Sequence, residues 1–131
     1  MNLKKAKKLS KQLMDKNGLK DWIFIWNELN IDKIRYNFKM GIFFSILFGE
    51  CDLKRKLLFF CPYLTEFSTE KEFKNIVLHE IAHAIVGEFN HGKKWKSKFI
   101  ELGGNGEESS AIDYEKFKKF IETKVDKKIL I

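Results

Sequence analysis

The sequence predicts a single α+β domain, built around one long helix near the middle of the chain. Three observations support this prediction. Short runs rich in aromatic and β-branched residues in the first half predict a small sheet. Apolar residues at helical spacing near both ends predict helices before and after that sheet. With 131 residues, of which 44% are hydrophobic, the chain can form one sizeable core.

The first helix is predicted over residues 3–16, where apolar residues recur at helical spacing between lysines. Asn17-Gly18 then provides a stop signal. The lysines give this helix a basic outer face, which suits either plain solvation or contact with an acidic partner such as DNA. These lysines are Lys4, Lys5, Lys7, Lys8 and Lys11.

A small sheet is predicted between the first helix and the long one. Its three strands are expected at residues 22–26, 43–48 and 56–60. Their apolar runs are continuous rather than alternating, which is typical of strands covered on both faces. Glu50-Cys51-Asp52 with Lys54 is interpreted as the hairpin turn before the third strand, and residues 28–40 remain ambiguous.

The long helix is predicted to run from about Glu70 to Val86. Thr69, with Glu72 three residues later, forms a capping box at its start. Gly87 can end the helix in a left-handed conformation. One apolar stripe of this helix is expected to pack on the sheet: Phe73, Val77, Ile81 and Ile85.

Two further helices are predicted after the long one. The first covers residues 92–102, with Trp95 and Phe99 on its apolar edge. Gly103-Gly104-Asn105-Gly106 follows as a turn. The last helix is expected at roughly 110–124, with three residues facing inward: Tyr114, Phe117 and Ile121.

All three histidines of the chain lie close together, at positions 79, 83 and 91. His79 and His83 are four residues apart, so a helix places them on one face, one turn apart. Two neutral imidazoles so placed can bind one zinc ion, and Glu80 beside them can hold a proton without being a ligand. His79-Glu80-Ile81-Ala82-His83 is therefore the H-E-x-x-H pattern of zinc metalloproteases, in which the glutamate is the general base.

The pattern leaves alternatives open. In a purely structural helix, the two histidines would bond to backbone or carboxylate groups instead of a metal ion. The apolar residues around the motif argue against that, because a buried Glu80 is costly without a partner. His91 is the expected third ligand, and it leaves a fourth position open, as in catalytic zinc sites. In a gluzincin arrangement Glu101 or Glu107 would replace His91, although solvated surface is the expected place of Glu101.

The same residues resemble a known family. His79-Glu80-Ile81-Ala82-His83, followed by His91-Gly92 and Trp95, resembles the SprT-like family of zincins, which are related to the Spartan proteases. The resemblance covers residues 76–104 and extends more weakly back to about Trp22. Metzincins fit less well, because they place a glycine three residues and a histidine six residues after the second histidine. Here those offsets are four and eight.

The resemblance implies a minimal zincin core within the α+β domain, over about residues 19–104, with a helical extension over residues 105–131. It implies Zn²⁺ as the cofactor and proteins bound or crosslinked to DNA as substrates. Many members of the family carry a four-cysteine zinc ribbon that binds DNA. This sequence contains two cysteines in all, so it lacks those ligands and, with them, one DNA-binding module of the family.

We expect a zinc-dependent endopeptidase in which Glu80 takes a proton from the attacking water and returns it to the leaving amine. The alternative is a zinc-containing protein that binds DNA or takes part in transcription without proteolysis, although such a protein has no need for Glu80. Tyr114 could stabilise the oxyanion, but a core position is expected for it. The third strand is the expected sheet edge along which an extended peptide substrate pairs.

Composition and charge indicate which binding partners and which cellular compartment to expect. The net charge of +7, mostly from lysine, predicts DNA binding without sequence specificity and with a preference for single strands. Cys51 and Cys61 form no C-x-x-C pair and are expected to be buried thiols. The lysine-rich start has no apolar segment behind it, as a secretory signal would. We expect a monomer in the cytoplasm, nucleoid or nucleus that is neither secreted nor bound to a membrane.

Overall fold

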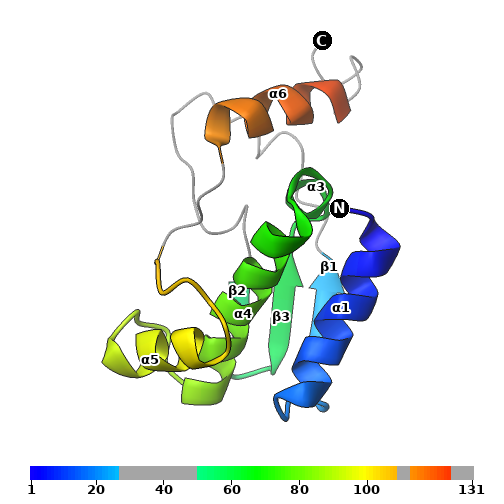
Figure 1. The fold of residues 1–131 in the computed structure, drawn as a ribbon. Helices are drawn as coiled ribbons and strands as arrows, with labels where there is room; N and C mark the ends of the chain where they lie inside the picture. The colour runs from blue at the N-terminus through cyan, green and yellow to red at the C-terminus, as the bar shows by residue number, and fades with distance from the viewer. Residues whose placement is uncertain (27–49, 109–112, 125–131) are drawn as a thin grey trace.

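The computed structural model describes residues 1–26, 50–108 and 113–124 (Figure 1). These residues form five helices and a three-stranded sheet, which confirms the α+β class. The elements in chain order are α1 (Leu3–Lys16), β1 (Ile23–Trp26), β2 (Glu50–Asp52), β3 (Leu57–Phe60), α3 (Pro62–Phe67), α4 (Glu70–Val86), α5 (Lys93–Glu101) and α6 (Tyr114–Lys124).

The sheet has the strand order β1-β3-β2, so β3 is its central strand. β1 runs parallel to β3, with Ile23 opposite Leu57 and Trp26 opposite Phe60. β2 runs antiparallel to β3 on its other side. The prediction that residues 56–60 form a substrate-binding edge is therefore wrong. β3 is an apolar strand with Leu58 and Phe60 buried, and a central position pairs its backbone on both sides.

The hairpin before β3 exists, but its turn lies later than predicted. Glu50–Asp52, which the sequence analysis assigned to the turn, is strand β2, and the turn covers residues 53–56. Asp52 Oδ1 accepts a hydrogen bond from the backbone N–H of Arg55 at 3.0 Å, which closes the turn. Lys56 completes it with a positive φ of 58°. The predicted strand at 43–48 lies outside the described residues.

Helix α4 begins and ends where the sequence predicts. Thr69 Oγ1 accepts from the backbone N–H of Glu72 at 3.1 Å, and Glu72 Oε1 accepts from the backbone N–H of Thr69 at 2.9 Å. This pair is the expected capping box. At the other end Gly87 is left-handed, with φ of 75°, and its N–H donates to the His83 carbonyl at 2.8 Å.

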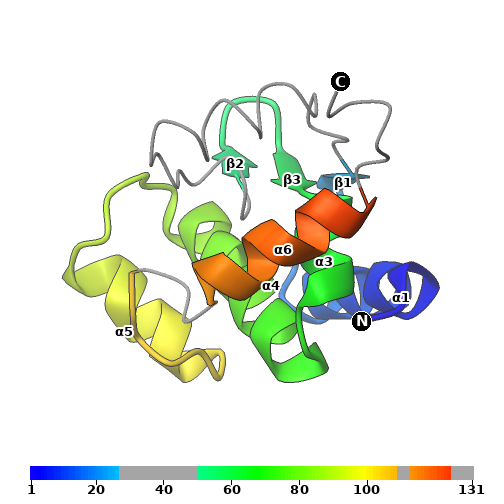
Figure 2. The same ribbon diagram turned by 90° about the horizontal axis from the view of Figure 1, so that it is seen from above.

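Helices α1 and α4 pack together on one side of the sheet (Figure 2). Aromatic rings join the layers: Phe24 of β1 stacks on Phe60 of β3 with centroids 4.4 Å apart, and Trp26 stacks on Phe73 of α4 at 6.0 Å. Burial of each large apolar side chain stabilises the fold by about 1.5–3 kcal/mol. The predicted inward stripe of α4 is confirmed for Phe73, Val77 and Ile81, which are buried.

Ile85, the fourth residue of that predicted stripe, is exposed, so its predicted contact with the sheet is wrong. It lies in the last turn of α4, and it lines a surface groove with residues of α5 instead of the sheet. Helix α5 spans the predicted range, with Gly92 as its N-cap and Leu102 as its C-cap. Trp95 and Phe99 are its buried residues, as predicted.

Helices α3 and α6 extend the fold beyond the sheet. α3 was not predicted, because six residues are too few to show a helical period. Pro62 lies in its first turn, where the backbone N–H that proline lacks would have no partner within the helix. α6 begins at Tyr114, later than expected, and Asp113 Oδ1 accepts from the backbone N–H of Lys116 at 3.1 Å. Phe117 is fully buried and contacts Phe67 of α3 at 5.3 Å.

Cys51 and Cys61 are buried thiols that are not joined in a disulfide, as predicted. No helix in the described part of the chain combines the length and the apolar character that crossing a bilayer requires.

Candidate metal centre

The three histidines converge on one point at the C-terminal half of α4. His79 and His83 project from successive turns of the helix, and His91 comes from the loop that follows Gly87. The Nε2 atom of His91 lies 3.1 Å from Nε2 of His79 and 3.2 Å from Nε2 of His83. One possible ligand atom from each residue lies within 4.8 Å of the others.

These distances fit a metal site. Two imidazole nitrogens bound to one zinc ion at ~2.0–2.1 Å in tetrahedral geometry are about 3.3–3.4 Å apart. The observed separations of 3.1 and 3.2 Å are within a few tenths of an ångström of that spacing. The three side chains are therefore arranged so that an ion can enter with little movement of the rings.

The backbone of the loop settles the tautomer of His83. Its Nδ1 lies 2.8 Å from the carbonyl oxygen of Glu88. Because a carbonyl can only accept, Nδ1 carries the proton, and Nε2 keeps a lone pair that points toward the other two rings. A backbone carbonyl behind a metal-facing imidazole is the usual outer partner of a histidine ligand.

Burial keeps the helix-borne histidines neutral. Burial first, and then repulsion from positive charge on His83 and His91, lower the pKa of His79 from 6.5 to about 3. The pKa of His83 is also lowered, first by burial and then by His91, although its bond to the Glu88 carbonyl opposes the shift. Both rings can therefore bind a cation at neutral pH without first losing a proton.

Glu80 lies beside the cluster. Its side chain is buried, and its Oε1 is 3.7 Å from Nε2 of His79. The sequence predicts that this carboxylate flanks the metal position without being a ligand, and that role stays a prediction. From its position the carboxylate can reach a water or substrate held beside the three histidines.

Trp95 of α5 packs against the three histidine rings. It is fully buried, and its ring centroid lies 4.5 Å from that of His91. Its indole N–H donates to the backbone carbonyl of His79 at 3.1 Å. The metal centre is thus assembled from α4, the following loop and α5.

The carboxylates considered as replacements for His91 lie elsewhere. Glu101 forms an ion pair with Lys98 at 3.0 Å, and its side chain is largely exposed. Glu107 is exposed, and its backbone N–H donates to Asn105 Oδ1. Among the described residues, the three histidines are the one group spaced to hold a metal ion. The side chain of Tyr114 lies outside the described residues.

Two loop contacts were missed by the sequence analysis. One is the Glu88 carbonyl, for which no side-chain pattern gives a signal. The other is Asn90, whose Oδ1 accepts from the backbone N–H of Gly92 at 2.9 Å. Asparagine two residues before glycine is a turn signal, so this contact could have been predicted.

The fold and the site together define a zincin-like α+β domain with a three-histidine candidate metal centre on its longest helix. The model of the SprT-like family matches residues 7–113. The chain therefore belongs to the SprT-like family, as its motif indicated.

A solved structure also shares the fold. It is the crystal structure of the metallopeptidase zymogen of Methanocaldococcus jannaschii jannalysin. The TM-score is 0.51 at 17% sequence identity, over 92% of this chain and 96% of that one. No curated protein sequence matches the chain.

Proposed function

We propose that this protein is a zinc-dependent metalloendopeptidase. The observation that carries the proposal is the convergence of three imidazole Nε2 atoms at ligand spacing with the buried carboxylate of Glu80 beside them. Membership of the SprT-like family supports it. The structural neighbour jannalysin, described as a metallopeptidase zymogen, is consistent with the same activity.

His79, His83 and His91 would hold the ion, which supplies Lewis acidity to a substrate carbonyl and to a water molecule. The chain's own catalytic group is Glu80. It accepts a proton from the water whose oxygen bonds to the peptide carbon. It then gives that proton to the amide nitrogen as the carbon–nitrogen bond breaks, which releases an amine and a carboxylic acid.

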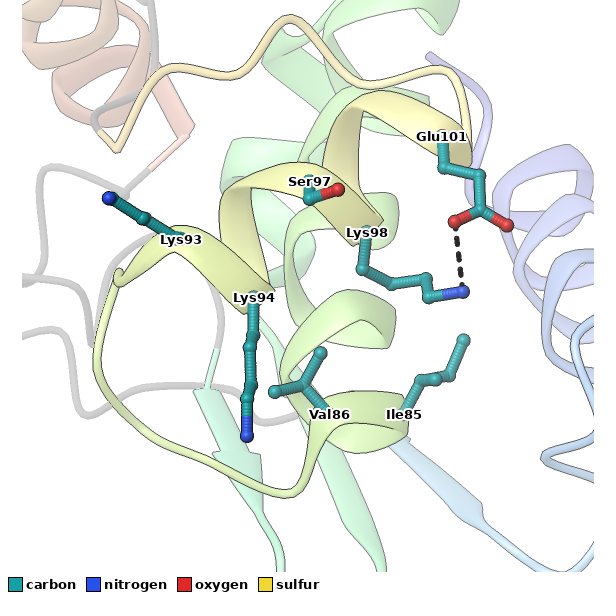
Figure 3. Close-up of a pocket in the computed structure, with 7 residues that line it drawn as sticks. All are labelled: Ile85, Val86, Lys93, Lys94, Ser97, Lys98 and Glu101. Atoms are coloured by element: carbon teal, nitrogen blue, oxygen red, sulfur yellow. Dashed lines mark hydrogen bonds and ion pairs between the residues drawn. The ribbon is translucent and has the colours of Figure 1, made fainter.

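We further propose that the substrates are proteins bound or crosslinked to DNA. The support is a cationic surface on α5, drawn in Figure 3, where Lys93, Lys94 and Lys98 line a surface groove together with Ile85 and Val86 of α4. Lys93 is exposed. The Lys94 side chain is 80% exposed and forms a long ion pair with Glu88 at 3.9 Å, whereas Lys98 is 29% exposed and is paired with Glu101 at 3.0 Å. Lys93 and the largely exposed Lys94 are therefore the two cations of this surface that phosphates would contact.

The decisive experiment measures metal content and cleavage together. Wild type is expected to carry one zinc per chain and to cut DNA-bound protein. Glu80→Gln is nearly isosteric but cannot take up the proton, so it should keep the zinc and lose about 10²–10⁴-fold in cleavage rate. Zinc and DNA binding with equal, negligible cleavage in both proteins would instead indicate the non-proteolytic zinc-containing binding protein.

DNA binding is tested separately by its salt dependence. Each phosphate contact on single strands contributes about −0.7 to the slope of log affinity against log salt. Replacing Lys93 and Lys94 by alanine should therefore reduce the slope by about 1.4. The matched control replaces Lys71 and Lys74, two exposed lysines in the first turns of α4. An equal reduction in the control would assign DNA binding to net charge rather than to this surface.

A further inference from the structure

One aromatic ring contacts all three candidate ligands. The ring centroid of Trp95 lies 4.5 Å from that of His91, 4.7 Å from that of His79 and 5.3 Å from that of His83. It meets His83 nearly parallel, at 22°, and the other two edge-on, at 64° and 77°. The indole thus contacts imidazoles from two separate segments of the chain.

The orientation of this indole is itself fixed. Trp95 is fully buried, so its N–H needs an acceptor, and it finds one in the backbone carbonyl of His79 at 3.1 Å. That bond ties α5 to α4 at the helix turn that carries the first candidate ligand. The ring therefore cannot rotate or slide without losing a buried hydrogen bond.

His79 and His91 depend on this contact more than His83 does. His83 has a second anchor, because its Nδ1–H donates to the Glu88 carbonyl at 2.8 Å. Within residues 1–26, 50–108 and 113–124, no protein acceptor is found for Nδ1 of His79 or His91. Trp95 is then the one ring that packs against both of these imidazoles and limits their rotation, while His79 also contacts Phe99 at 5.5 Å.

We infer that Trp95 is a positioning residue that sets the three imidazoles at ligand spacing before the ion arrives. The inference rests on the proposed metal-dependent function. It goes further by assigning the preorganisation of the centre to one side chain that binds no metal. Replacing Trp95 should weaken metal binding by about 10–100-fold, the effect typical of removing a residue that orients a metal ligand without binding the metal.

The competing explanation is that Trp95 is simply a large core residue. A purely structural role would lower stability and leave metal affinity of the folded protein unchanged. The control is therefore Phe73→Leu, at a core position of α4 that is 1% exposed and packs on Trp26 and Phe60. Trp95→Phe keeps an apolar ring and removes the N–H and part of the surface under the histidines.

The first test measures zinc affinity of each full-length protein by competition with a chelator, and stability by urea unfolding. Trp95→Phe should weaken zinc binding about 10-fold or more, whereas Phe73→Leu should lose stability and keep wild-type affinity. Equal zinc affinity in Trp95→Phe and wild type would overturn the inference. Failure of wild type itself to bind zinc would reject the proposed function instead.

A second test leaves Trp95 in place. The chain has three tryptophans, so Trp22→Phe/Trp26→Phe makes Trp95 the sole indole. Because its ring touches all three imidazoles, zinc should change its fluorescence in that variant. Trp95→Phe, loaded with zinc as verified by metal analysis, should show no change. A response that persists in Trp95→Phe, or is absent from the Trp95-only protein, would show that the ring does not sense the centre.

Discussion

The candidate metal centre joins two halves that are built differently. His79 and His83 stand one turn apart on α4, where helix geometry alone places them on the same face. His91 comes from a loop and is exposed, whereas His83 is 5% exposed. The helix half, His79 and His83, is therefore fixed by local backbone geometry. The loop half, His91, depends on tertiary contacts.

Three such contacts hold the loop half. Gly87 turns the chain out of α4 in a left-handed conformation. Asn90 Oδ1 closes a tight turn onto the N–H of Gly92, which is the N-cap of α5. The face of Trp95 then supports the His91 ring. Removing any one of them should affect metal binding more than it affects the rest of the fold.

Removing a ligand from each half gives the largest expected effect. His83→Ala and His91→Ala should each weaken zinc binding by more than the ~100-fold that loss of an outer partner costs. The two variants should differ in metal-free stability. His83→Ala empties a buried position and should cost about 1–3 kcal/mol, whereas His91→Ala removes an exposed ring and should cost little. Metal analysis and urea unfolding measure both quantities.

Glu101→Ala serves as the control for this pair. Its carboxylate pairs with Lys98 on the surface of α5, so zinc content should remain that of wild type. Loss of zinc from Glu101→Ala with retention in His91→Ala would show that the loop half of the centre is wrongly assigned. It would restore the gluzincin arrangement considered from the sequence.

Lowering the pH should destabilise the folded protein by protonating His79, which belongs to the helix half of the centre. The pKa of His79 is lowered from 6.5 to about 3 in the folded protein, so the unfolded chain binds this proton more readily. The stability that follows from the neutral ring is present above pH 6.5 and is lost as pH falls toward 3, at up to about 1.4 kcal/mol per pH unit. Urea unfolding of the metal-free protein between pH 7.5 and 4.5 measures this slope.

The matched variant for the acid experiment is His79→Gln. It removes the titrating group, so its stability should fall less steeply with acid than that of wild type. Identical slopes in the two proteins would mean that burial of His79 does not resist protonation. The same measurement with zinc present should show a steeper loss in wild type, because protons and zinc then compete for the same nitrogens.

The contrast between the halves also explains what the sequence could predict. The bounds of α4, its capping box and the facing of His79 and His83 follow from rules that span three or four residues. The position of the His91 ring depends on its contact with Trp95, and the loop is joined to α4 by the bond between the Glu88 carbonyl and Nδ1 of His83. No short-range rule specifies either contact. The His91 assignment came instead from the resemblance and from the clustering of histidines.

The sheet shows the same limit more strongly. The strand character of Leu57–Phe60 was evident from its residues, yet its central place depends on parallel pairing with β1, far away in the sequence. Local patterns contain no information on which strand becomes an edge. The turn at residues 53–56 was misplaced because Asp52 begins it through its side chain while its backbone still belongs to β2.

The smallest effects are expected from substitutions at the two ends of α4. Thr69→Ala removes the N-cap and should cost about 1 kcal/mol of stability, with no change in zinc affinity, because that end is remote from the histidines. Gly87→Ala meets no atom within 4 Å, yet its φ of 75° should cost an alanine about 1–2 kcal/mol. Because Gly87 leads into the His91 loop, strain there should also weaken zinc binding. Equal zinc affinity in the two variants would show that the loop half is held by Trp95 and Asn90 alone and does not depend on the helix end.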